Sequence, residues 1–355
     1  MLTALIFVAA YAIVAAGRAP WLRIDRTGAA LVGAVLMVVT GAVTLDEAAD
    51  AVDVRTIVLL FSMMVIVAHL TLSGGLAACG GWVSRTVTRP AWLVFALVFA
   101  SGILSALFVN DTICLVFTPM VVSVVAARGL PPLPYLLALA TASNIGSAAT
   151  LTGNPQNILI GSVSGIPFTT FLADAGPLAL LLLLLDALLI CAMFRRQLAV
   201  VTSTAPIPRT PRTRVHRPLL IKTLVVVAGV LVAFLTGADT AVAAAAGAAA
   251  LLVTRRLRPA RIYRAVDWDL LMLFAGLFVL VAAAEKSGLA STLFVWMRPL
   301  RIETIPGLSL AAALLSNAIS NVPAVMLFTP LVPQLPDPPQ AWTALAVAST
   351  LAGNS

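Results

Sequence analysis

Two stretches of this 355-residue chain carry polar side chains in the middle of apolar runs, and the two stretches resemble each other. The first is LSALFVNDTICLVFTP at residues 104–119, and the second is LSNAISNVPAVMLFTP at residues 315–330. Polar groups are costly in hydrocarbon unless they line a cavity. A polar interruption at matching positions of two halves is typical of the binding site of a secondary transporter.

The first interruption consists of Asn110, Asp111 and Thr112. At the tip of a helical hairpin, these residues would offer hard oxygen ligands suited to Na⁺, and Asp111 is also a titratable acid for H⁺. Alternatively, Asp111 only caps the second hairpin helix, and both roles can hold at once. In the second copy Val322 aligns with Asp111, so the two tips are chemically unequal. The predicted binding residues of the second tip are Ser316, Asn317, Ser320, Asn321 and Pro323.

The segment from 143 to 157 is too polar to remain a regular lipid-facing helix. Pro155 lacks an N–H and disfavours helix at Asn154, so we expect the span to break near Gly153 and Asn154. The half-helix that restarts at Pro155 would present its partly positive N-terminus, with free N–H donors, to a cavity. A close-packing face between helices is the alternative. The predicted binding residues are Ser143, Asn144, Thr150, Thr152, Gly153, Asn154, Pro155 and Asn157, with Ser349, Gly353 and Asn354 as counterparts near the end of the chain.

A further carboxylate, Asp186, lies in the leucine-rich run LLLLLDALLI. We interpret Asp186, like Asp111, as a candidate proton relay, and the alternative for Asp186 is a bond to a backbone or hydroxyl group of a neighbouring helix. Arg55 and Lys222 lie near the ends of predicted spans, and no Lys or Arg lies deeper within one. The charge of an anionic solute would therefore be met by helix N-termini, N–H and O–H donors and co-bound cations. We predict no cofactor or metal centre, apart from Na⁺ or H⁺ as a coupling ion, and the sequence has no motif of a hydrolytic enzyme.

Composition places these residues in a membrane. The chain is 61% hydrophobic and 10% charged, with a mean hydropathy of +1.06, whereas soluble domains have about 25% charged residues. The three cysteines favour neither a disulfide framework nor a metal site. We expect hairpin regions near 91–126 and 305–333, and a last span from Trp342. The other expected spans lie near residues 2–17, 28–45, 54–72, 134–163, 174–194, 219–236, 238–254 and 268–284.

The net charge of +8 is distributed as a topology signal. With residues 195–217 in the cytoplasm, eighteen of the 22 Lys and Arg residues lie inside, and only Arg55, Lys286, Arg298 and Arg301 lie outside. This asymmetry places the N-terminus outside the cytoplasmic (inner) membrane. The basic loops are therefore expected to contact lipid headgroups, and a nucleic-acid site is not expected.

The duplication defines the organisation of the chain. We predict a first repeat at 1–195, a basic cytoplasmic linker at 196–217 and a second repeat at 218–355. An odd number of crossings in the first repeat places the second in the opposite orientation. The second copy stops inside its last motif, so we expect a chain truncated at its C-terminus. The predicted fold is an all-α polytopic membrane protein of two inverted-topology repeats, each with a re-entrant helical hairpin and a broken transmembrane helix.

On these motifs the chain resembles the ion transporter superfamily, which includes arsenite permeases, citrate carriers, divalent anion:sodium symporters and certain Na⁺/H⁺ antiporters. ALFVNDTICLVFTP is similar to the first hairpin of arsenite permeases, and SNIGSAATLTGNPQNILIG and SNVPAVMLFTP are similar to bacterial anion permeases. The tips depart from the Ser-Asn-Thr of sodium-dicarboxylate carriers, which makes proton coupling through Asp111 the competing expectation.

The resemblance implies a secondary active transporter that moves an anion, either a carboxylate or an inorganic oxyanion, by alternating access coupled to H⁺ or Na⁺. Arsenite or antimonite efflux and Na⁺/H⁺ antiport are the alternatives. The expected partners are a small anionic solute and membrane lipid. A homodimer and a separate ATPase partner, which some arsenite permeases have, are further alternatives for the partners of this chain.

Overall fold

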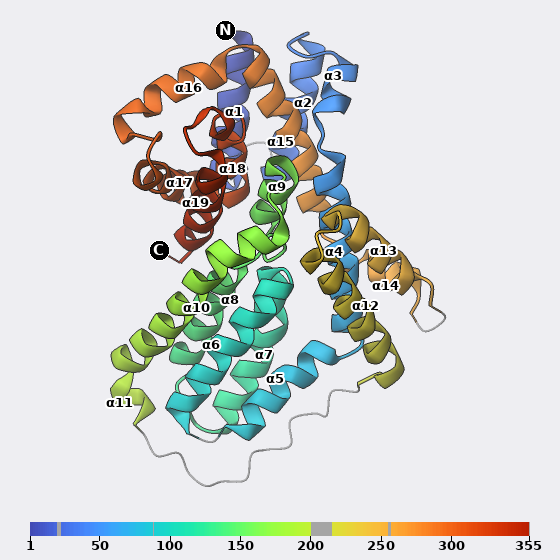
Figure 1. Cartoon of the computed structure of the whole chain (residues 1–355), viewed down its shortest axis with the longest axis vertical. Coiled ribbons are helices and arrows are strands. Elements are labelled where there is room, and N and C mark those ends of the chain that lie inside the picture. Colours follow the sequence, from blue (N-terminus) through green and yellow to red (C-terminus); the bar gives the residue numbers. More distant parts are fainter. Residues whose placement is uncertain (20–22, 88, 200–214, 255–256, 355) are drawn as a thin grey trace. The chain divides into compact units, whose positions relative to one another are not determined.

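The computed structural model describes residues 1–19, 23–87, 89–199, 215–254 and 257–354 (Figure 1). It confirms an all-α polytopic membrane protein. In these ranges, six helices are long and apolar enough to cross a membrane: α4 (Val54–Leu72), α6 (Pro90–Leu107), α7 (Asn110–Ala127), α10 (Phe168–Met193), α12 (Arg217–Leu235) and α15 (Trp268–Lys286). Four shorter apolar helices are α1 (Leu2–Ala16), α2 (Arg26–Val39), α13 (Thr240–Leu252) and α17 (Ile305–Ile319).

The remaining elements are shorter. Strands β1 (Arg18–Ala19) and β2 (Ile24–Asp25) form a two-residue antiparallel pair. The 3-10 helices are η1 (Arg298–Leu300) and η2 (Val332–Gln334). The other α-helices are α3 (Leu45–Ala51), α5 (Gly75–Thr86), α8 (Leu133–Ser147), α9 (Pro155–Ser164), α11 (Arg195–Leu198), α14 (Pro259–Tyr263), α16 (Leu289–Met297), α18 (Asn321–Phe328) and α19 (Pro338–Ala352).

The predicted interruptions fall where helices end. The first hairpin region is the pair α6 and α7, joined by residues 108–109, and the second is the pair α17 and α18, joined at Ser320. The expected span at 134–163 is divided into α8 and α9, and the restart at Pro155 is confirmed. The re-entrant character of the hairpins stays a prediction.

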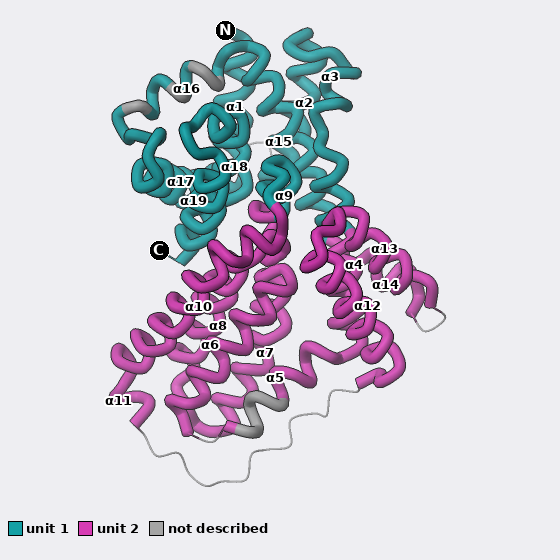
Figure 2. The backbone as a smooth tube through the Cα atoms, in the orientation of Figure 1, with its two compact units in different colours: residues 1–61, 158–166, 267–355 teal, residues 62–157, 167–266 magenta. Residues whose placement is uncertain are grey.

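The chain forms two compact units (Figure 2). Unit 1 contains residues 1–61, 158–166 and 267–355, and unit 2 contains residues 62–157 and 167–266. Helices α4 and α9 each contribute to both units. The units group residues by contact, whereas the predicted repeats group them by sequence, so the division at 195 and 218 stays a prediction. Residues 200–214 of the predicted linker lie outside the described residues.

The helices follow a partly similar order in the two predicted repeats. The short helix α14 follows α12 and α13 as the short α3 follows α1 and α2, but α18 has 8 residues where α7 has 18. The antiparallel relation of the two halves stays a prediction.

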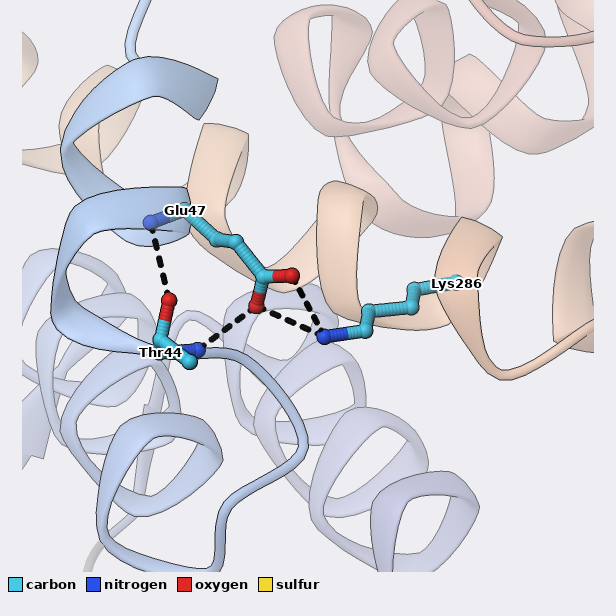
Figure 3. A network of polar contacts seen from close by, with 3 residues as sticks. All are labelled: Thr44, Glu47 and Lys286. Carbon is cyan, nitrogen blue, oxygen red and sulfur yellow. Dashed lines mark hydrogen bonds and ion pairs between the residues drawn. The ribbon is translucent and has the colours of Figure 1, made fainter.

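In unit 1, an ion pair connects the short helix α3 to the C-terminal end of α15 (Figure 3). The Glu47 N–H donates to Oγ1 of Thr44 over 3.1 Å, and the Thr44 N–H donates to Oε2 of Glu47 over 2.7 Å, which is a capping box. Lys286 donates to both carboxylate oxygens of Glu47 over 2.6 Å. The ion pair lowers the pKa of Glu47 below its ordinary value, with the Thr44 backbone bond as a second cause.

In unit 2, α8 packs against α6, α7 and α10. The contact between α6 and α8 is a close approach of two backbones at Gly146, because a Cβ on Gly146 would lie 2.1 Å from the carbonyl oxygen of Gly102. Phe117, Tyr135 and Phe171 are fully buried around α8. These contacts hold the polar C-terminal half of α8 inside the protein.

Candidate functional site

The break between α8 and α9 is held together by the side chain of Asn154. Oδ1 of Asn154 accepts from the N–H of Asn157 over 2.8 Å, and Nδ2 of Asn154 donates to Oγ of Ser147 over 3.1 Å. Asn154 therefore caps the start of α9. We expected this helix end to leave its N–H donors free, but the cap already uses the N–H of Asn157.

A second amide completes the break. Nδ2 of Asn157 donates to the carbonyl of Ser147 over 3.2 Å and to that of Thr150 over 2.9 Å. The last carbonyls of a helix have no partner within the helix, and here a side chain supplies one. A Cβ on Gly153 would lie 2.2 Å from the carbonyl oxygen of Ser147, so the fold of the break requires glycine there. Every residue from 142 to 160 is buried.

The first hairpin tip lies against this break. The N–H of Asn110 donates to the carbonyl of Gly153 over 3.1 Å, and Nδ2 of Asn110 lies 3.5 Å from Oδ1 of Asn144. The hydroxyl of Thr150 donates to the carbonyl of Ala106, near the end of α6. The structure therefore brings together two predicted interruptions that are far apart in the sequence.

One helical turn after Asn110, α7 makes a further contact with α8. Sγ of Cys114 lies 2.7 Å from Oγ of Ser143. The sequence predicted no role for Cys114, so this contact was missed. Its signal is spacing, because Asn110 and Cys114 are four residues apart and their partners Asn144 and Ser143 are adjacent.

Three buried oxygens at this junction have no hydrogen-bond partner among the described residues: Oδ1 of Asn110, Oδ1 of Asn157 and Oγ of Ser105. A buried polar atom without a partner costs about 1–3 kcal/mol, so such atoms need a specific reason. Amide and hydroxyl oxygens are suited to accept hydrogen bonds from a solute or to bind a hard cation. Ser105 was not predicted from the sequence.

Other predicted residues of the first copy are less closely involved. Asp111 is exposed in the first turn of α7, and the N–H of Thr112 donates to the carbonyl of Val109 over 3.1 Å. Thr152 is buried, and its hydroxyl lies 3.5 Å from that of Thr150. The roles of Asp111 and Thr112 as ligands stay predictions.

The second hairpin tip and the counterpart of the helix break lie in unit 1, where α17, α18 and α19 pack together. Oγ of Ser316 is buried without a partner among the described residues. Ser320 joins the two hairpin helices with φ +80° and ψ 157°, and its N–H donates to the carbonyl of Ser316 over 2.9 Å. The remaining predicted residues range from buried (Pro323 and Ser349) through half-buried (Asn321) to exposed (Asn317, Gly353 and Asn354).

Asp186 contacts a hydroxyl group of a neighbouring helix. Its Oδ2 lies 3.0 Å from the hydroxyl of Thr141, on α8. The alternative of a bond to a neighbouring hydroxyl is therefore confirmed, and a relay role stays a prediction. In the described part of the chain, no group of three or more His, Cys, Asp or Glu residues is arranged to hold a metal ion.

Comparison with known proteins shows which family this chain belongs to. The citrate transporter family matches residues 10–352. A silicon efflux transporter of rice (Oryza sativa subsp. japonica) is 31% identical over 94% of this chain and 83% of its own length. An uncharacterized transporter of Mycobacterium tuberculosis is 32% identical over 98% of this chain and 86% of its own. A putative transporter of Dictyostelium discoideum, arsB, is 30% identical over 50% of this chain and 31% of its own. The chain therefore belongs to the citrate transporter family, within the ion transporter superfamily, and is a multi-pass membrane transporter, not an enzyme.

Proposed function

We propose that this protein is a secondary active transporter that moves an anion, a carboxylate or an inorganic oxyanion, across the cytoplasmic membrane by alternating access coupled to H⁺ or Na⁺. The observation that carries the proposal is the junction of the first hairpin tip with the helix break. There, the side-chain oxygens of Asn110, Asn157 and Ser105 are buried and have no partner among the described residues, whereas the amide nitrogens of the two asparagines are bonded.

The chemistry of the junction favours an anion that enters together with a cation. The four helices that form it, α6, α7, α8 and α9, contain no Lys or Arg. The hydroxyl of Ser105 can donate to an anion, and the amide oxygens of Asn110 and Asn157 can bind the coupling cation. Since burial of a lone charge is costly, a bound pair of opposite charges is cheaper to move than either ion alone.

The tip of the second copy is proposed to present polar groups of the same kind to a solute. A buried hydroxyl at Ser316, one turn before the second tip, supports this, because it has no partner among the described residues. In the first copy the corresponding residue is Ser105, whose hydroxyl is also buried and has no partner in the part of the chain that the structure describes.

Reconstitution of the purified full-length protein in liposomes tests this function. With an imposed H⁺ or Na⁺ gradient, we expect saturable uptake of a labelled anion such as citrate. Asn110→Ala should reduce uptake at least ten-fold, because the side chain contacts Asn144 and carries an unpartnered oxygen. Ser123→Ala, at an exposed position of the same helix, is the control. A leak that does not saturate and ignores both gradients contradicts the proposal.

A second candidate function is efflux of arsenite or antimonite. The relatives named as a silicon efflux transporter and as arsB favour it. A site of neutral donors and acceptors also suits an undissociated oxyacid with several hydroxyl groups. Expression in an arsenite-sensitive host distinguishes the candidates, because restored growth on arsenite supports efflux, whereas uptake of citrate without restored growth supports the first function. Na⁺/H⁺ antiport would appear as proton movement driven by Na⁺ with no anion present.

A further inference from the structure

The contact between Asp186 and Thr141 connects α10 to α8 within unit 2. Helix α10 presents leucines at its exposed surface: Leu180, Leu181, Leu184, Leu185, Leu188 and Leu189. Asp186 is half-buried on the same helix, and its carboxylate contacts the hydroxyl of Thr141 and no other polar group of the described residues. Helix α10 packs against α8 and α6, so this carboxylate lies at a helix–helix interface in an apolar span.

The hydrogen-bond geometry at Thr141 fits the protonated acid best. Its hydroxyl lies 2.9 Å from the carbonyl of Leu137 and 3.0 Å from Oδ2 of Asp186. A threonine hydroxyl has one proton and cannot donate to both oxygens. If Asp186 is protonated, it donates to Thr141, which donates to Leu137, and both contacts are hydrogen bonds. If Asp186 is ionised, Thr141 must turn its proton to the carboxylate and give up Leu137.

The surrounding helices provide no cation that contacts Asp186. Helix α6 has no ionisable side chain, and α8 has only Tyr135. The other ionisable residues on α10 and on the helices packed against it, α11 and α12, are Asp174, Cys191, Arg195, Arg196, Arg217 and Lys222. Among the residues that the structure describes, none of these contacts Asp186, and Lys222 donates to the carbonyl of Val253 over 2.7 Å. An ionised carboxylate in such a span is costly, so protonation changes the local energy strongly.

Thr141 lies on α8 immediately before the site. Ser143 and Asn144, which contact Cys114 and Asn110, follow it within one turn. We propose that Asp186 takes up and releases the coupling proton and that Thr141 transmits its protonation state to α8, which makes Asp186 a positioning residue for the solute site. This inference rests on the proposed function and selects H⁺ as the coupling ion. The step is a reversible protonation of one carboxylate oxygen by water, with no other bond made or broken.

Two transport assays on the reconstituted full-length protein test the inference. One measures counterflow of labelled solute at equal concentrations with no ion gradient, and the other measures uptake driven by a pH gradient. Asp186→Asn mimics the protonated acid because its amide can still donate to Thr141. We expect this variant to keep counterflow within two-fold of the wild type, to lose at least ten-fold in pH-driven uptake and to show a flat pH profile.

Thr141 variants and a matched carboxylate complete the experiment. Thr141→Ser keeps the hydroxyl and should behave as the wild type, whereas Thr141→Val removes it and should shift the pH profile. Asp174→Asn, at an exposed position of the same helix, should change neither assay. If Asp186→Asn does not insert, Thr141→Val decides the question with Asp186 intact.

Outcomes that overturn this inference differ from those that overturn the function. An unchanged pH profile in Asp186→Asn, or in a folded Thr141→Val, shows that the contact is only structural. Uptake driven by Na⁺ and indifferent to pH also refutes the inference and leaves an anion transporter. Absence of saturable transport by the wild type refutes the proposed function itself.

Discussion

At the scale of single residues, the helix break depends on two asparagine side chains. Asn154 caps the start of α9 by accepting from the N–H of Asn157, and Asn157 donates to the carbonyl of Ser147, at the end of α8, and to that of Thr150 in the connecting segment. Neither role involves a solute. The polar character of the segment therefore has a structural explanation that precedes any binding function, and only the unpartnered oxygens remain to be explained by binding.

The side chain of Asn154 is predicted to stabilise the protein through two separate hydrogen bonds, one to the N–H of Asn157 and one to Ser147. Asn154→Ala removes the cap and the bond to Ser147, so we expect a loss of about 1–3 kcal/mol. Asn154→Ser stays neutral in this buried position and keeps an oxygen that can cap the start of α9, but it lacks the amide N–H that donates to Ser147, so we expect an intermediate loss. Thermal unfolding of the purified variants in detergent measures both. Equal losses in the two variants would show that the cap contributes nothing.

Glu47 is predicted to make stability depend on acid pH. The pKa of Glu47 is lowered in the folded protein by Lys286, so folding favours the ionised form. The contribution is complete above the unfolded pKa, near 4.3, and is lost as the pH falls through the lowered folded value. We expect Lys286→Met to be slightly less stable than the wild type at pH 7, with a difference that disappears in acid and shrinks in high salt.

A conservative variant is the control for this pH effect. Lys286→Arg retains the positive charge and should follow the wild-type dependence of melting temperature on pH. A difference between Lys286→Met and the wild type that is as large at pH 3 as at pH 7 would exclude the ion pair as its cause.

At the scale of helices, α6 and α8 contact each other through their backbones at Gly102 and Gly146. The oxygen that a new Cβ on Gly146 would meet belongs to the main chain, so it cannot move aside as a flexible side chain could. We predict that Gly146→Ala costs about 1–3 kcal/mol or more through overpacking. Gly229→Ala in α12 is the control, since nothing lies within 4 Å of its Cβ position and alanine favours the helix. Folded yield after size exclusion, with melting temperature, reports the result, and equal behaviour of both variants would refute the close contact.

The two hairpins differ in backbone conformation at equivalent positions. Val109 has φ −61°, whereas Ser320 has φ +80°, a conformation that is strained for any residue with a side chain. We predict that Ser320→Gly raises stability by about 1 kcal/mol, while Val109→Gly lowers it by a similar amount because glycine gives the unfolded chain more freedom. Chemical unfolding of the two variants measures both changes. A loss of stability in Ser320→Gly would show that its side chain is worth more than the strain.

At the scale of the whole molecule, the distribution of Lys and Arg is the basis of the predicted topology. An epitope inserted in the linker at 195–217 should be reachable by antibody only from the cytoplasmic side, and one inserted at 301–304, between η1 and α17, only from the opposite side. Selective permeabilisation of cells measures both. Epitopes on the same side would contradict the inverted arrangement.

Local sequence signals predicted most of the fold. Pro155 lacks a donor, which predicts the start of α9, and runs of apolar residues predicted the long helices. Short helices such as α3 were missed, because their ends depend on caps such as Thr44 and Glu47 rather than on apolar length. The strain at Ser320 was also missed, since serine does not by itself require a positive φ.

The site was predicted only in part, for a similar reason. The polar segments could be found because each one interrupts an apolar run. Their partners could not, because the contacts of Cys114 with Ser143 and of Asp186 with Thr141 join helices far apart in the chain. A hydroxyl or thiol in an apolar helix also has the ordinary alternative of packing in the core, and only the folded arrangement distinguishes the two.

The hydrogen bonds that Asn154 and Asn157 make across the break between α8 and α9 have a consequence for the proposed transport cycle. A segment that keeps its shape with nothing bound does not collapse after the cargo departs, so the vacant carrier can reorient and begin again. Net accumulation of solute requires that the empty carrier reorients. A protein whose binding site folds only around its solute is limited to one-for-one exchange. If the chain works as the transporter proposed above, we therefore expect net uptake of solute with none present on the opposite side of the membrane.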